Sequence, residues 1–371
     1  IGRSGKTQLI NTGTLQSNAE FSPAILYQAI GGGGGSADSA NGTVQIGSRN
    51  ATGLQSAQSM TLRNTGNLFT FGRYSPTIFA QAIGGGGGRI GRTSGGSVSI
   101  GSIDASASPD LSGESITSFI DSASSVDLSG GDITINSFGA LLSTTGDYSQ
   151  ALSAQSIGGG GGWVGPIEGN LTLGSQNSAA LMDGGDITVT NRAVILTTGN
   201  TSPGISLQSI GGGGGYTGQV DGSAQFGSSN SAGSQSAGKV SLTNSGSIQT
   251  TGNFSPLINV QSIGGGGGRA GDIGTSLNLG ASNLIGAIAI GGDVNVRNTA
   301  ERLISKGLSS PALLAQSIGG GGGATAEVTG NVLMGASGTG TANAGAVEVT
   351  SSSLIQTTGN NSIGLLAQSV G

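Results

Sequence analysis

The 371-residue chain contains no cysteine and no histidine. Without cysteine it forms no disulfide and no thiolate metal site, which suits a chain that is exported before it folds. Without histidine it lacks the commonest general base of enzymes and the commonest ligand of transition metals. Together the two absences remove many catalytic and metal-binding classes.

Charged and aromatic residues are also scarce, at 8% and 4% of the chain. The formal net charge of −5 is small for this length and no basic stripe is present, so we expect no nucleic-acid partner. No run of 18 apolar residues occurs, so the sequence predicts no membrane-spanning helix. Hydrophobic residues nevertheless make up 34% of the chain, and β-branched residues recur at fixed positions, which argues against disorder.

Glycine is abundant, with 76 residues. It does not recur at every third residue, which excludes collagen. Instead, six runs of five glycines each follow Gln-Ala-Ile or Gln-Ser-Ile, and they begin at Gly31, Gly84, Gly158, Gly211, Gly264 and Gly319. The glutamines that head these units, spaced 53, 74, 53, 53, 55 and 52 residues apart, are Gln28, Gln81, Gln155, Gln208, Gln261, Gln316 and Gln368. A nearly fixed period of this length indicates a repeat protein.

The repeats run through the whole sequence, so we expect one elongated domain over residues 1–371. The copies end near residues 35, 88, 162, 215, 268 and 323, and a last copy, 324–371, stops where the next glycine run would begin. Both ends interrupt a repeat, and we therefore expect the chain to be a fragment of a longer protein.

Each repeat contains four short phrases in which apolar and polar residues alternate, the pattern of a strand with one buried face. In one copy they are SAQFG (223–227), GKVSLTN (238–244), GSIQTTGN (246–253) and SPLINVQSI (255–263). Glycine, serine, threonine and asparagine dominate, and all four disfavour helix interiors. The sequence therefore predicts strands and negligible helix.

The fourth phrase indicates which face of its strand is buried. One phase stays apolar, as in Ile205 and Leu207 or Ile258 and Val260. The other phase varies freely and contains Leu26, Phe79, Ser153, Ser206, Asn259, Leu314 and Leu366. We expect the apolar phase to face a core and the variable phase to face outward.

Short strands at a fixed period predict an all-β fold, a parallel β-solenoid, or β-helix, whose coils stack on one another. We expect about two coils per repeat, because half of 53 residues is about 26, within the 20 to 45 residues typical of structural repeats. The longest spacing then adds about one coil, in residues 103–125. A single coil per repeat, the alternative, would enclose a wide cross-section that needs more large apolar side chains. About 14 coils would make a rod of roughly 70 Å.

Stacking would also order the glycine runs. Equivalent runs about 4.8 Å apart could form ladders at a tight corner or a close backbone approach; packed polyproline II segments and flexible linkers are the alternatives. The repeated glutamine could hydrogen-bond to its own copies along the stack, unless it is an exposed turn residue. We predict structural ladders at the seven glutamines and at the first glycine of each run.

Few motifs in the sequence point to a catalytic, nucleotide-binding or metal-binding site. The glycine runs lack the Lys-Ser or Lys-Thr of nucleotide-binding loops. Gly-Gly-Asp sequences are shared with calcium-binding nonapeptides, but the later glycine is missing, so Asp132, Asp186 and Asp293 are better interpreted as turn residues than as calcium ligands. The densest acidic group, interpreted as solvated turn positions, is Asp104, Asp110, Glu114 and Asp121. We expect no catalytic, cofactor or metal site and no small-molecule substrate.

Two aromatic residues hold the same place after successive glycine runs. They are Trp163, the only tryptophan, and Tyr216. We consider two interpretations, an exposed contact site for sugar or protein and a pair of rings that covers the edge of a coil.

The phrase Gln-Ser-Ile-Gly-Gly-Gly-Gly-Gly, with Thr-Asn-x-Gly-x-Ile-x-Thr-Thr-Gly-Asn-x-Ser before it, is clearest at residues 243–268. It resembles the repeat regions of giant bacterial autotransporter-type surface proteins, including adhesins of the filamentous-haemagglutinin style. The resemblance covers essentially the whole chain. It implies an exported passenger on the surface of a Gram-negative cell, whose outer-membrane translocator lies outside this sequence.

We therefore expect a structural stalk that serves attachment, aggregation or biofilm formation, and not an enzyme. Its partners would be host or neighbouring-cell surfaces, glycans, or copies of itself. Two alternatives remain open. One is a self-associating extracellular filament or matrix protein, and the other is a β-helix that binds or cleaves polysaccharide, in which acids and aromatic residues would converge in one groove.

Overall fold

The computed structural model describes residues 2–47, 53–102, 126–176, 180–282 and 284–371. All regular secondary structure in these residues is β-strand. Each strand pairs in parallel with the strand at the same place in the neighbouring repeat, so that, for example, Gln155 lies beside Gln208. The chain is thus a parallel β-solenoid, and this prediction is confirmed.

The strands form five main sheets and one small one. Sheet A contains β1 (Thr7–Asn11), β6 (Met60–Asn64), β11 (Ile133–Ser137), β16 (Ile187–Asn191), β21 (Val240–Asn244), β27 (Val294–Asn298) and β33 (Val347–Ser351). Sheet B contains β2 (Leu15–Ser17), β7 (Leu68–Thr70), β12 (Leu141–Thr144), β17 (Val194–Thr197), β22 (Ile248–Thr250), β28 (Arg302–Ser305) and β34 (Leu354–Thr357). Sheet C contains β3 (Ile25–Ile30), β8 (Ile78–Ile83), β13 (Leu152–Ile157), β18 (Ile205–Ile210), β23 (Ile258–Ile263), β29 (Leu313–Ile318) and β35 (Leu365–Val370).

The remaining sheets begin at or after the glycine runs. Sheet D contains β4 (Gly34–Asn41), β9 (Gly87–Ser94), β14 (Gly161–Val164), β19 (Gly214–Thr217), β24 (Gly267–Ala270) and β30 (Gly322–Thr325). Sheet E contains β5 (Val44–Ile46), β10 (Val98–Ile100), β15 (Leu171–Leu173), β20 (Ala224–Phe226), β25 (Leu277–Leu279) and β31 (Val332–Met334). Sheet F pairs β26 (Leu284–Ile288) with β32 (Gly338–Thr341).

Each repeat forms one coil, so the expectation of about two coils per repeat is wrong. Strands β1 to β5 complete one circuit before β6 returns to pair with β1. Sheets A, B and C each contain seven strands, which mark seven coils. At about 4.8 Å per coil the stack is roughly 34 Å long, half of the expected length.

The longest spacing does not add a coil either. Strand β10 precedes the extra residues and pairs with both β5 and β15, while β11 follows them and pairs with both β6 and β16. The extra residues therefore leave the stack between neighbouring coils unbroken. They lie outside the described residues, as do Asp104, Asp110, Glu114 and Asp121.

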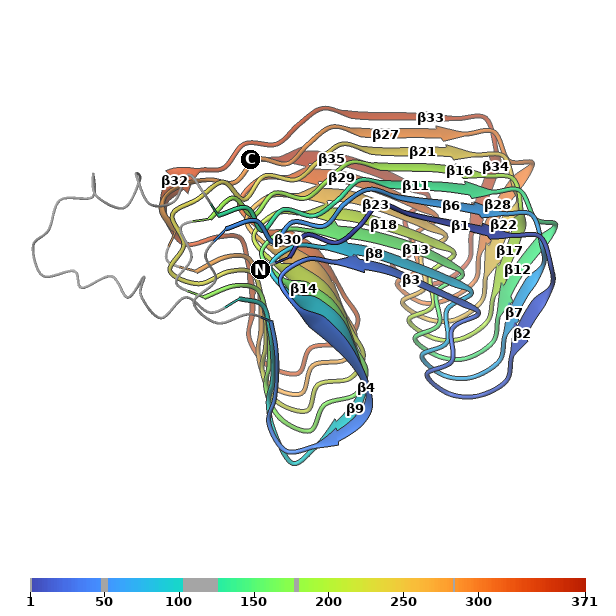
Figure 1. Ribbon diagram of the computed structural model, residues 1–371. Helices are drawn as coiled ribbons and strands as arrows, with labels where there is room; N and C mark the ends of the chain where they lie inside the picture. The colour runs from blue at the N-terminus through green and yellow to red at the C-terminus, as the bar shows by residue number, and fades with distance from the viewer. Residues whose placement is uncertain (1, 48–52, 103–125, 177–179, 283) are drawn as a thin grey trace, which may run out of the picture.

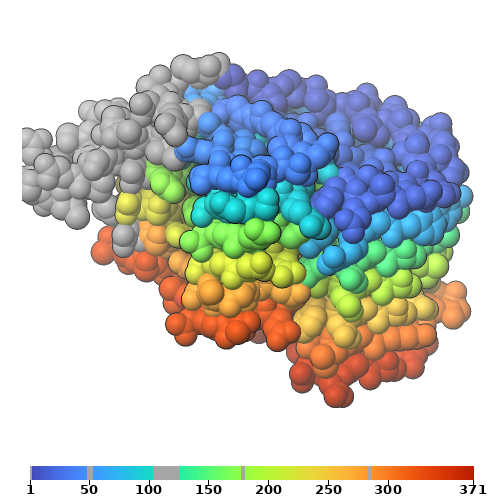
Figure 2. All heavy atoms as spheres, turned by 90° about the horizontal axis from the view of Figure 1, so that it is seen from below, coloured from blue at the N-terminus to red at the C-terminus, as the bar shows by residue number. Residues whose placement is uncertain are grey.

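Each coil is wide because it is divided into parts, which Figure 1 shows along the stack. Sheets A, B and C surround one core, which we call lobe 1, and sheets D and E face each other around a second core, lobe 2. The chain then makes a third arm, which contains sheet F and leads from sheet E into sheet A of the next coil. Colour bands in Figure 2 show the successive coils lying directly on one another.

Several small cores replace the single large one that a 53-residue coil seemed to require. Lobe 1 buries Leu62 and Ile205, and lobe 2 buries Ile100 and Phe226. The third arm has its own cluster around Met182. The chain folds back between these cores, so backbone fills space that we expected large side chains to fill.

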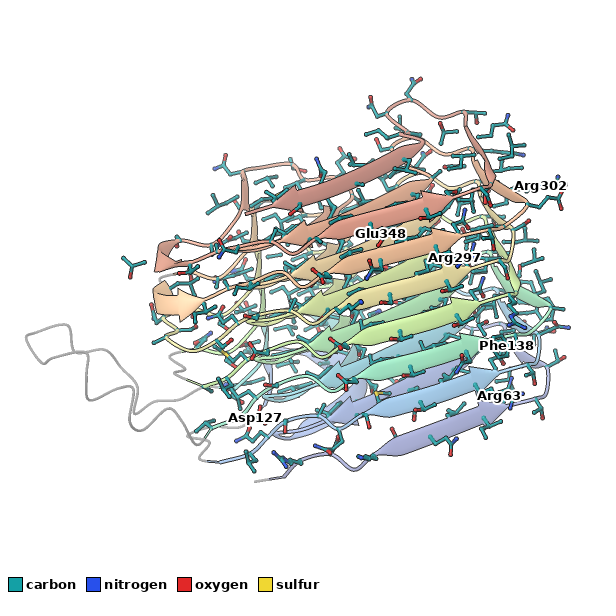
Figure 3. All side chains as sticks on the ribbon, turned by 90° about the horizontal axis from the view of Figure 1, so that it is seen from above. Arg63, Asp127, Phe138, Arg297, Arg302 and Glu348 are labelled. Atoms are coloured by element: carbon teal, nitrogen blue, oxygen red, sulfur yellow. The ribbon has the colours of Figure 1, made fainter. Side chains whose placement is uncertain are left out.

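The variable phase of sheet C does not face outward through the middle of the stack. Phe79 and Asn259 are fully buried, and Ser153 and Ser206 are nearly so. In β8, β13, β18 and β23 both faces are buried, because lobe 2 lies against the face that points away from lobe 1. By contrast, the outer face of sheet A presents polar side chains such as Arg63, Arg297 and Glu348 (Figure 3).

Columns of polar side chains join the coils at their turns. One column contains the serine of each Ser-Pro and the serines at the same position in the other coils. From the second coil on, each serine hydroxyl accepts a hydrogen bond from the backbone N–H of the serine in the preceding coil, at 2.9 to 3.0 Å. The column consists of Ser22, Ser75, Ser149, Ser202, Ser255, Ser310 and Ser362. Asparagines in sheet A form a second column, in which Asn191 donates to Asn244 and Asn244 to Asn298, each at 2.8 Å. The turns are thus fixed by their own copies.

Candidate functional site

The seven glutamines of the repeat form a continuous column on the face of sheet C that points away from lobe 1. Each amide Nε2 donates to the Oε1 of the next copy at 2.6 to 2.9 Å, through Gln28, Gln81, Gln155, Gln208, Gln261, Gln316 and Gln368. Gln81, Gln208 and Gln261 are fully buried. A buried amide needs partners for its donor and its acceptor, and the stack supplies both.

The glycine runs lie where lobe 1, lobe 2 and the third arm meet, a junction that we call the glycine hub. The second and third glycines of every run have positive φ, as at Gly212 (80°) and Gly213 (95°). The backbone groups are also paired. Gly212 N–H donates to Met182 O at 2.8 Å, and Gly266 N–H donates to Gly211 O at 2.5 Å. The runs are therefore ordered corners that end in strands of sheet D, and neither linkers nor polyproline II segments.

Close approach excludes side chains from the glycine hub. A Cβ on the first glycine of a run would meet third-arm backbone, at 2.0 Å from Gln235 O for Gly211 and 2.2 Å from Leu128 O for Gly84. The same position in the other runs, Gly31, Gly158, Gly264 and Gly319, would meet backbone at 2.1 to 2.6 Å. Cβ atoms do not approach backbone so closely without displacement, so only glycine fits.

Serine side chains tie the glycine hub to the third arm. Ser156, from a Gln-Ser-Ile unit, donates its hydroxyl to Gly131 O at 2.8 Å and accepts from Gly185 N–H at 2.7 Å. The first two copies read Gln-Ala-Ile and lack this bridge. Ser228, which follows β20, donates to the carbonyl oxygen of Gly212 at 2.6 Å. The glycine hub thus joins all three parts of the coil.

Trp163 and Tyr216 are buried between the lobes, at 1% exposure each, so of the two interpretations the exposed contact site is wrong. Their rings project from sheet D toward sheet C. The Phe79 ring centroid lies 5.2 Å from that of Trp163 and 6.3 Å from that of Tyr216. They form an interlobe layer with Tyr74 and Tyr148. Sequence alone could not reveal that lobe 2 would cover this face.

Two arginines belong to the same column of sheet D. The Arg89 guanidinium lies 4.9 Å from the Trp163 ring centroid and pairs with Asp38 at 3.0 Å. Arg269 is 3% exposed and donates to Phe254 O at 2.8 Å. Burial lowers the pKa of the Arg269 guanidinium. The interlobe layer therefore combines stacked rings with cations.

A second aromatic column enters the interlobe layer from the turn between sheets B and C. Phe21, Tyr74 and Tyr148 have φ of 54° to 56°, and neighbouring rings stack at 4.9 and 4.8 Å between centroids. Burial raises the pKa of Tyr74 to about 12. Burial also raises the pKa of Tyr148, as does the hydrogen bond that its hydroxyl donates to Asp272. The sequence analysis missed this column, although an aromatic residue precedes Ser-Pro or Ser-Gln in each of these turns.

The Gly-Gly-Asp aspartates lie directly before strands of sheet A. Asp132 Oδ1 accepts from Asp186 N–H at 2.9 Å, Asp186 Oδ1 accepts from Lys239 N–H at 2.7 Å, and Asp293 Oδ1 accepts from Ala346 N–H at 2.9 Å. They act as turn residues between coils. No cluster of three acidic side chains that could hold a metal ion occurs in the part of the chain that the structure describes.

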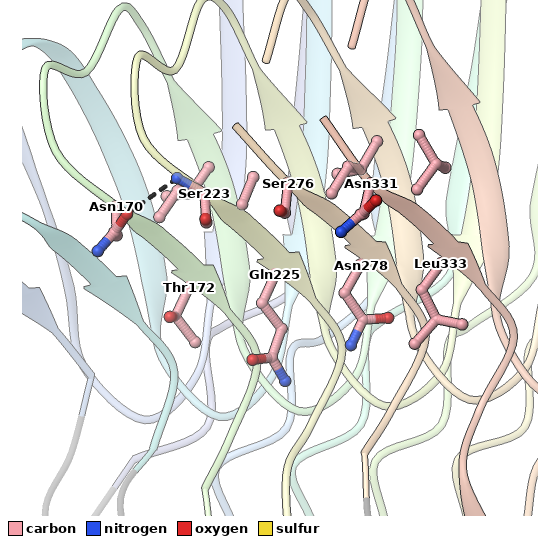
Figure 4. A pocket seen from close by; sticks show the side chains of 12 residues that line it. Asn170, Thr172, Ser223, Gln225, Ser276, Asn278, Asn331 and Leu333 are labelled. Atoms are coloured by element: carbon pink, nitrogen blue, oxygen red, sulfur yellow. Dashed lines mark hydrogen bonds between the residues drawn. The ribbon is translucent and has the colours of Figure 1, made fainter. Parts of the chain in front are cut away.

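A surface groove runs across coils on the outer face of sheet E (Figure 4). It has a volume of about 650 Å³ and includes Thr172, Ser223, Gln225 and Asn278. Asn170 Oδ1 accepts from Ser223 N–H at 2.8 Å across neighbouring coils. None of the residues that line it is charged or aromatic. The groove therefore offers hydrogen bonds but no pair of carboxylates for glycoside cleavage.

Comparison of the chain with protein-family models, curated proteins and solved structures finds no match. No helix in the described ranges is long and apolar enough to cross a membrane. The fold places the chain in the class of parallel β-solenoid repeat proteins, with a coil that is divided into separate cores.

Proposed function

We propose that this chain is a structural stalk of an exported bacterial surface protein, which holds contacts for attachment, aggregation or biofilm formation away from the cell. It lies outside the cell, on a chain that other segments anchor to the outer membrane. Its partners are host or neighbouring-cell surfaces, their glycans, or copies of itself. The chain contributes length and stiffness.

One observation carries the proposal. The strands of sheets A, B and C, together with the column of glutamine side chains, continue through all seven coils without a break in register, from β3 to β35 in sheet C. Axial hydrogen bonds of this kind resist bending and local opening, because a coil cannot leave without breaking pairs on both sides. The resemblance of the repeat to autotransporter-type surface proteins also supports the proposal.

The test changes stalk length in the full protein on the bacterium that makes it. Ten extra copies of residues 294–346 lengthen the stack by roughly 48 Å at about 4.8 Å per coil. Antibody against the repeats should label intact cells, and attachment or aggregation should change with coil number. Arg63→Gln and Glu348→Gln, on the outer face of sheet A, serve as matched controls that should leave attachment unchanged. Repeats confined to the cytoplasm, or attachment that does not depend on coil number, would contradict the proposal.

A further inference from the structure

A small polar pocket lies at the seam where a turn of lobe 1 meets lobe 2. Its volume is about 200 Å³. Lobe 1 contributes Arg73 and Tyr74, and three successive coils of lobe 2 contribute Arg92, then Pro166 to Glu168, then Gln219 and Asp221. The pocket is therefore built from both lobes and is distinct from the groove on sheet E.

The charged groups of this seam pocket keep unused hydrogen-bonding capacity. Glu168 Oε2 accepts from Gly95 N–H at 3.0 Å, and Asp221 Oδ1 accepts from Gln219 Nε2 at 2.8 Å. Each carboxylate is held in place by one oxygen, which leaves its other oxygen for a ligand. The Arg92 side chain makes no ion pair or hydrogen bond with any described residue. Its five N–H donors face water or a ligand.

In the next coil a hydrogen bond crosses the equivalent seam. Tyr148 stacks on Tyr74 and holds the same position one coil further on. Val220 pairs with Ile273, so Asp272 holds the position that Gln219 holds one coil earlier. The Tyr148 hydroxyl donates to Asp272. Tyr74 makes no hydrogen bond to a side chain at the equivalent point. The side-chain hydrogen bond that joins the lobes in the next coil is therefore missing at the seam pocket.

The lining of the pocket carries as many positive as negative side chains, and this balance of charge indicates the class of ligand. Two guanidinium groups disfavour a cation, and two carboxylates disfavour an anion. Donors and acceptors that alternate around a small space suit vicinal hydroxyl groups, which donate and accept at once. Pro166, which is partly exposed, adds apolar surface for the C–H face of a ring. The volume equals that of roughly seven water molecules, enough for one sugar ring.

We infer that the seam pocket binds a single neutral sugar residue of a glycan, with Arg92 and Asp221 as its main hydrogen-bonding groups. The inference does not depend on the stalk function, because a stalk without a sugar site is equally stiff. It gives the stalk a lateral contact along its side.

The experiment is saturation-transfer difference NMR on the intact 371-residue chain. The probes are methyl β-D-glucopyranoside, methyl β-D-galactopyranoside, methyl α-D-mannopyranoside and sodium glucuronate. We expect at least one neutral glycoside to bind with a dissociation constant of roughly 1 to 10 mM, as befits a ligand of this size. Arg92→Gln and Asp221→Ala should each weaken binding at least tenfold. Both positions are exposed, so the variants should keep the wild-type far-UV circular dichroism.

Arg63→Gln and Glu348→Gln are the control variants, since they change charge on sheet A, away from the seam. They should bind the glycoside as the wild type does. The inference is overturned if no neutral glycoside shows transfer, if the two pocket variants bind like the controls, or if glucuronate binds more tightly than every neutral probe.

Discussion

At the residue scale, the repeated glutamine acts through its copies. Gln208 is fully buried, donates to Gln261 at 2.8 Å and accepts from Gln155 at 2.9 Å. A glutamine in this position is useful only if the coils above and below carry one too. The repetition of the residue is therefore a consequence of stacking.

Replacement of one amide should therefore leave two others unsatisfied. We expect Gln208→Ala to lower the free energy of unfolding by about 2–4 kcal/mol, because Gln155 loses its acceptor and Gln261 its donor in a buried layer. Gln249→Ala, on the outer face of sheet B, should change it by less than about 0.5 kcal/mol. Urea unfolding followed by circular dichroism measures both. Equal effects at the two positions would show that the column contributes no stability.

Much of this residue-scale detail could be anticipated from the repeat. An identical glutamine in seven copies pointed to a column of amide hydrogen bonds, and such a column runs through the structure. Trp163 could not be placed in the same way. Whether an outward-facing ring meets water or another lobe depends on how the chain folds back, which the alternation within one strand does not encode.

At the scale of elements, the lobes are held together by matched residues two coils apart. The Tyr74 ring lies against Gly218, where an added Cβ would be 2.3 Å from its Cε1. Tyr148 lies against Gly271 in the same way, at 2.8 Å. Where the turn residue is instead small, as at Thr201, the residue two coils on is not glycine but Ala326.

This matching predicts a rescue. Gly218→Ala should lower the free energy of unfolding by about 1–3 kcal/mol, because the methyl group overlaps the Tyr74 ring. In a Tyr74→Ala background the same substitution should have almost no further effect, since the ring is gone. A double-mutant cycle by urea unfolding measures the coupling. Additive effects would mean that the contact between lobes at Gly218 is loose.

The buried tyrosines of the interlobe layer also predict a pH dependence. Burial raises the pKa of Tyr74 to about 12 and raises those of Tyr148 and Tyr216 as well, whereas an unfolded chain titrates near 10. The unfolded state therefore loses protons first. The stability that each neutral tyrosine contributes is fully present below pH 10 and is lost as the pH rises from 10 towards 12.

Each such tyrosine should make the free energy of unfolding fall by about 1.4 kcal/mol per pH unit in that range. Urea unfolding between pH 9 and 11.5 measures the slope. Tyr74→Phe removes one titrating group and should reduce the slope by that amount. A wild-type stability that stays level from pH 9 to 11.5 would mean that these hydroxyls ionise in the folded chain.

The strands themselves were largely predictable, since their alternation appears in each phrase. The strands of sheet D were not, because they begin within the glycine runs and glycine carries no alternation. Overlooking sheet D concealed lobe 2, and lobe 2 is what buries the variable phase of sheet C. The missing sheet D thus accounts for two wrong expectations, that Trp163 could be exposed and that the variable phase of sheet C faces outward.

At the scale of the whole molecule, the unit of stacking is the full repeat. We expected half-repeats because a wide coil seemed to need a large apolar core. The structure instead divides the coil into two lobes and an arm that meet at glycine backbone, so 53 residues close with modest cores. Counting apolar side chains cannot reveal this, because glycine contributes none.

The size of the unit can be tested by adding sequence. Val294 and Val347 occupy the same register position, so residues 294–346 form one complete coil. Three extra copies inserted after Ala346 should fold, and the stack should lengthen by roughly 14 Å. The insertion lies beyond the residues that meet the Tyr74 and Tyr148 rings, so their glycine contacts stay intact.

Three copies of the half-repeat, residues 294–319, are the matched control. Each copy would run from Gly319 directly to Val294 and would lack the strands of sheets D, E and F, so the added segments cannot pair with lobe 2 and the third arm of the coils next to them. Small-angle X-ray scattering should report a longer particle for the full repeats and an expanded, partly unfolded one for the halves. If the half-repeats lengthened the stack in ordered steps, the coil would contain half as many residues as this structure assigns to it.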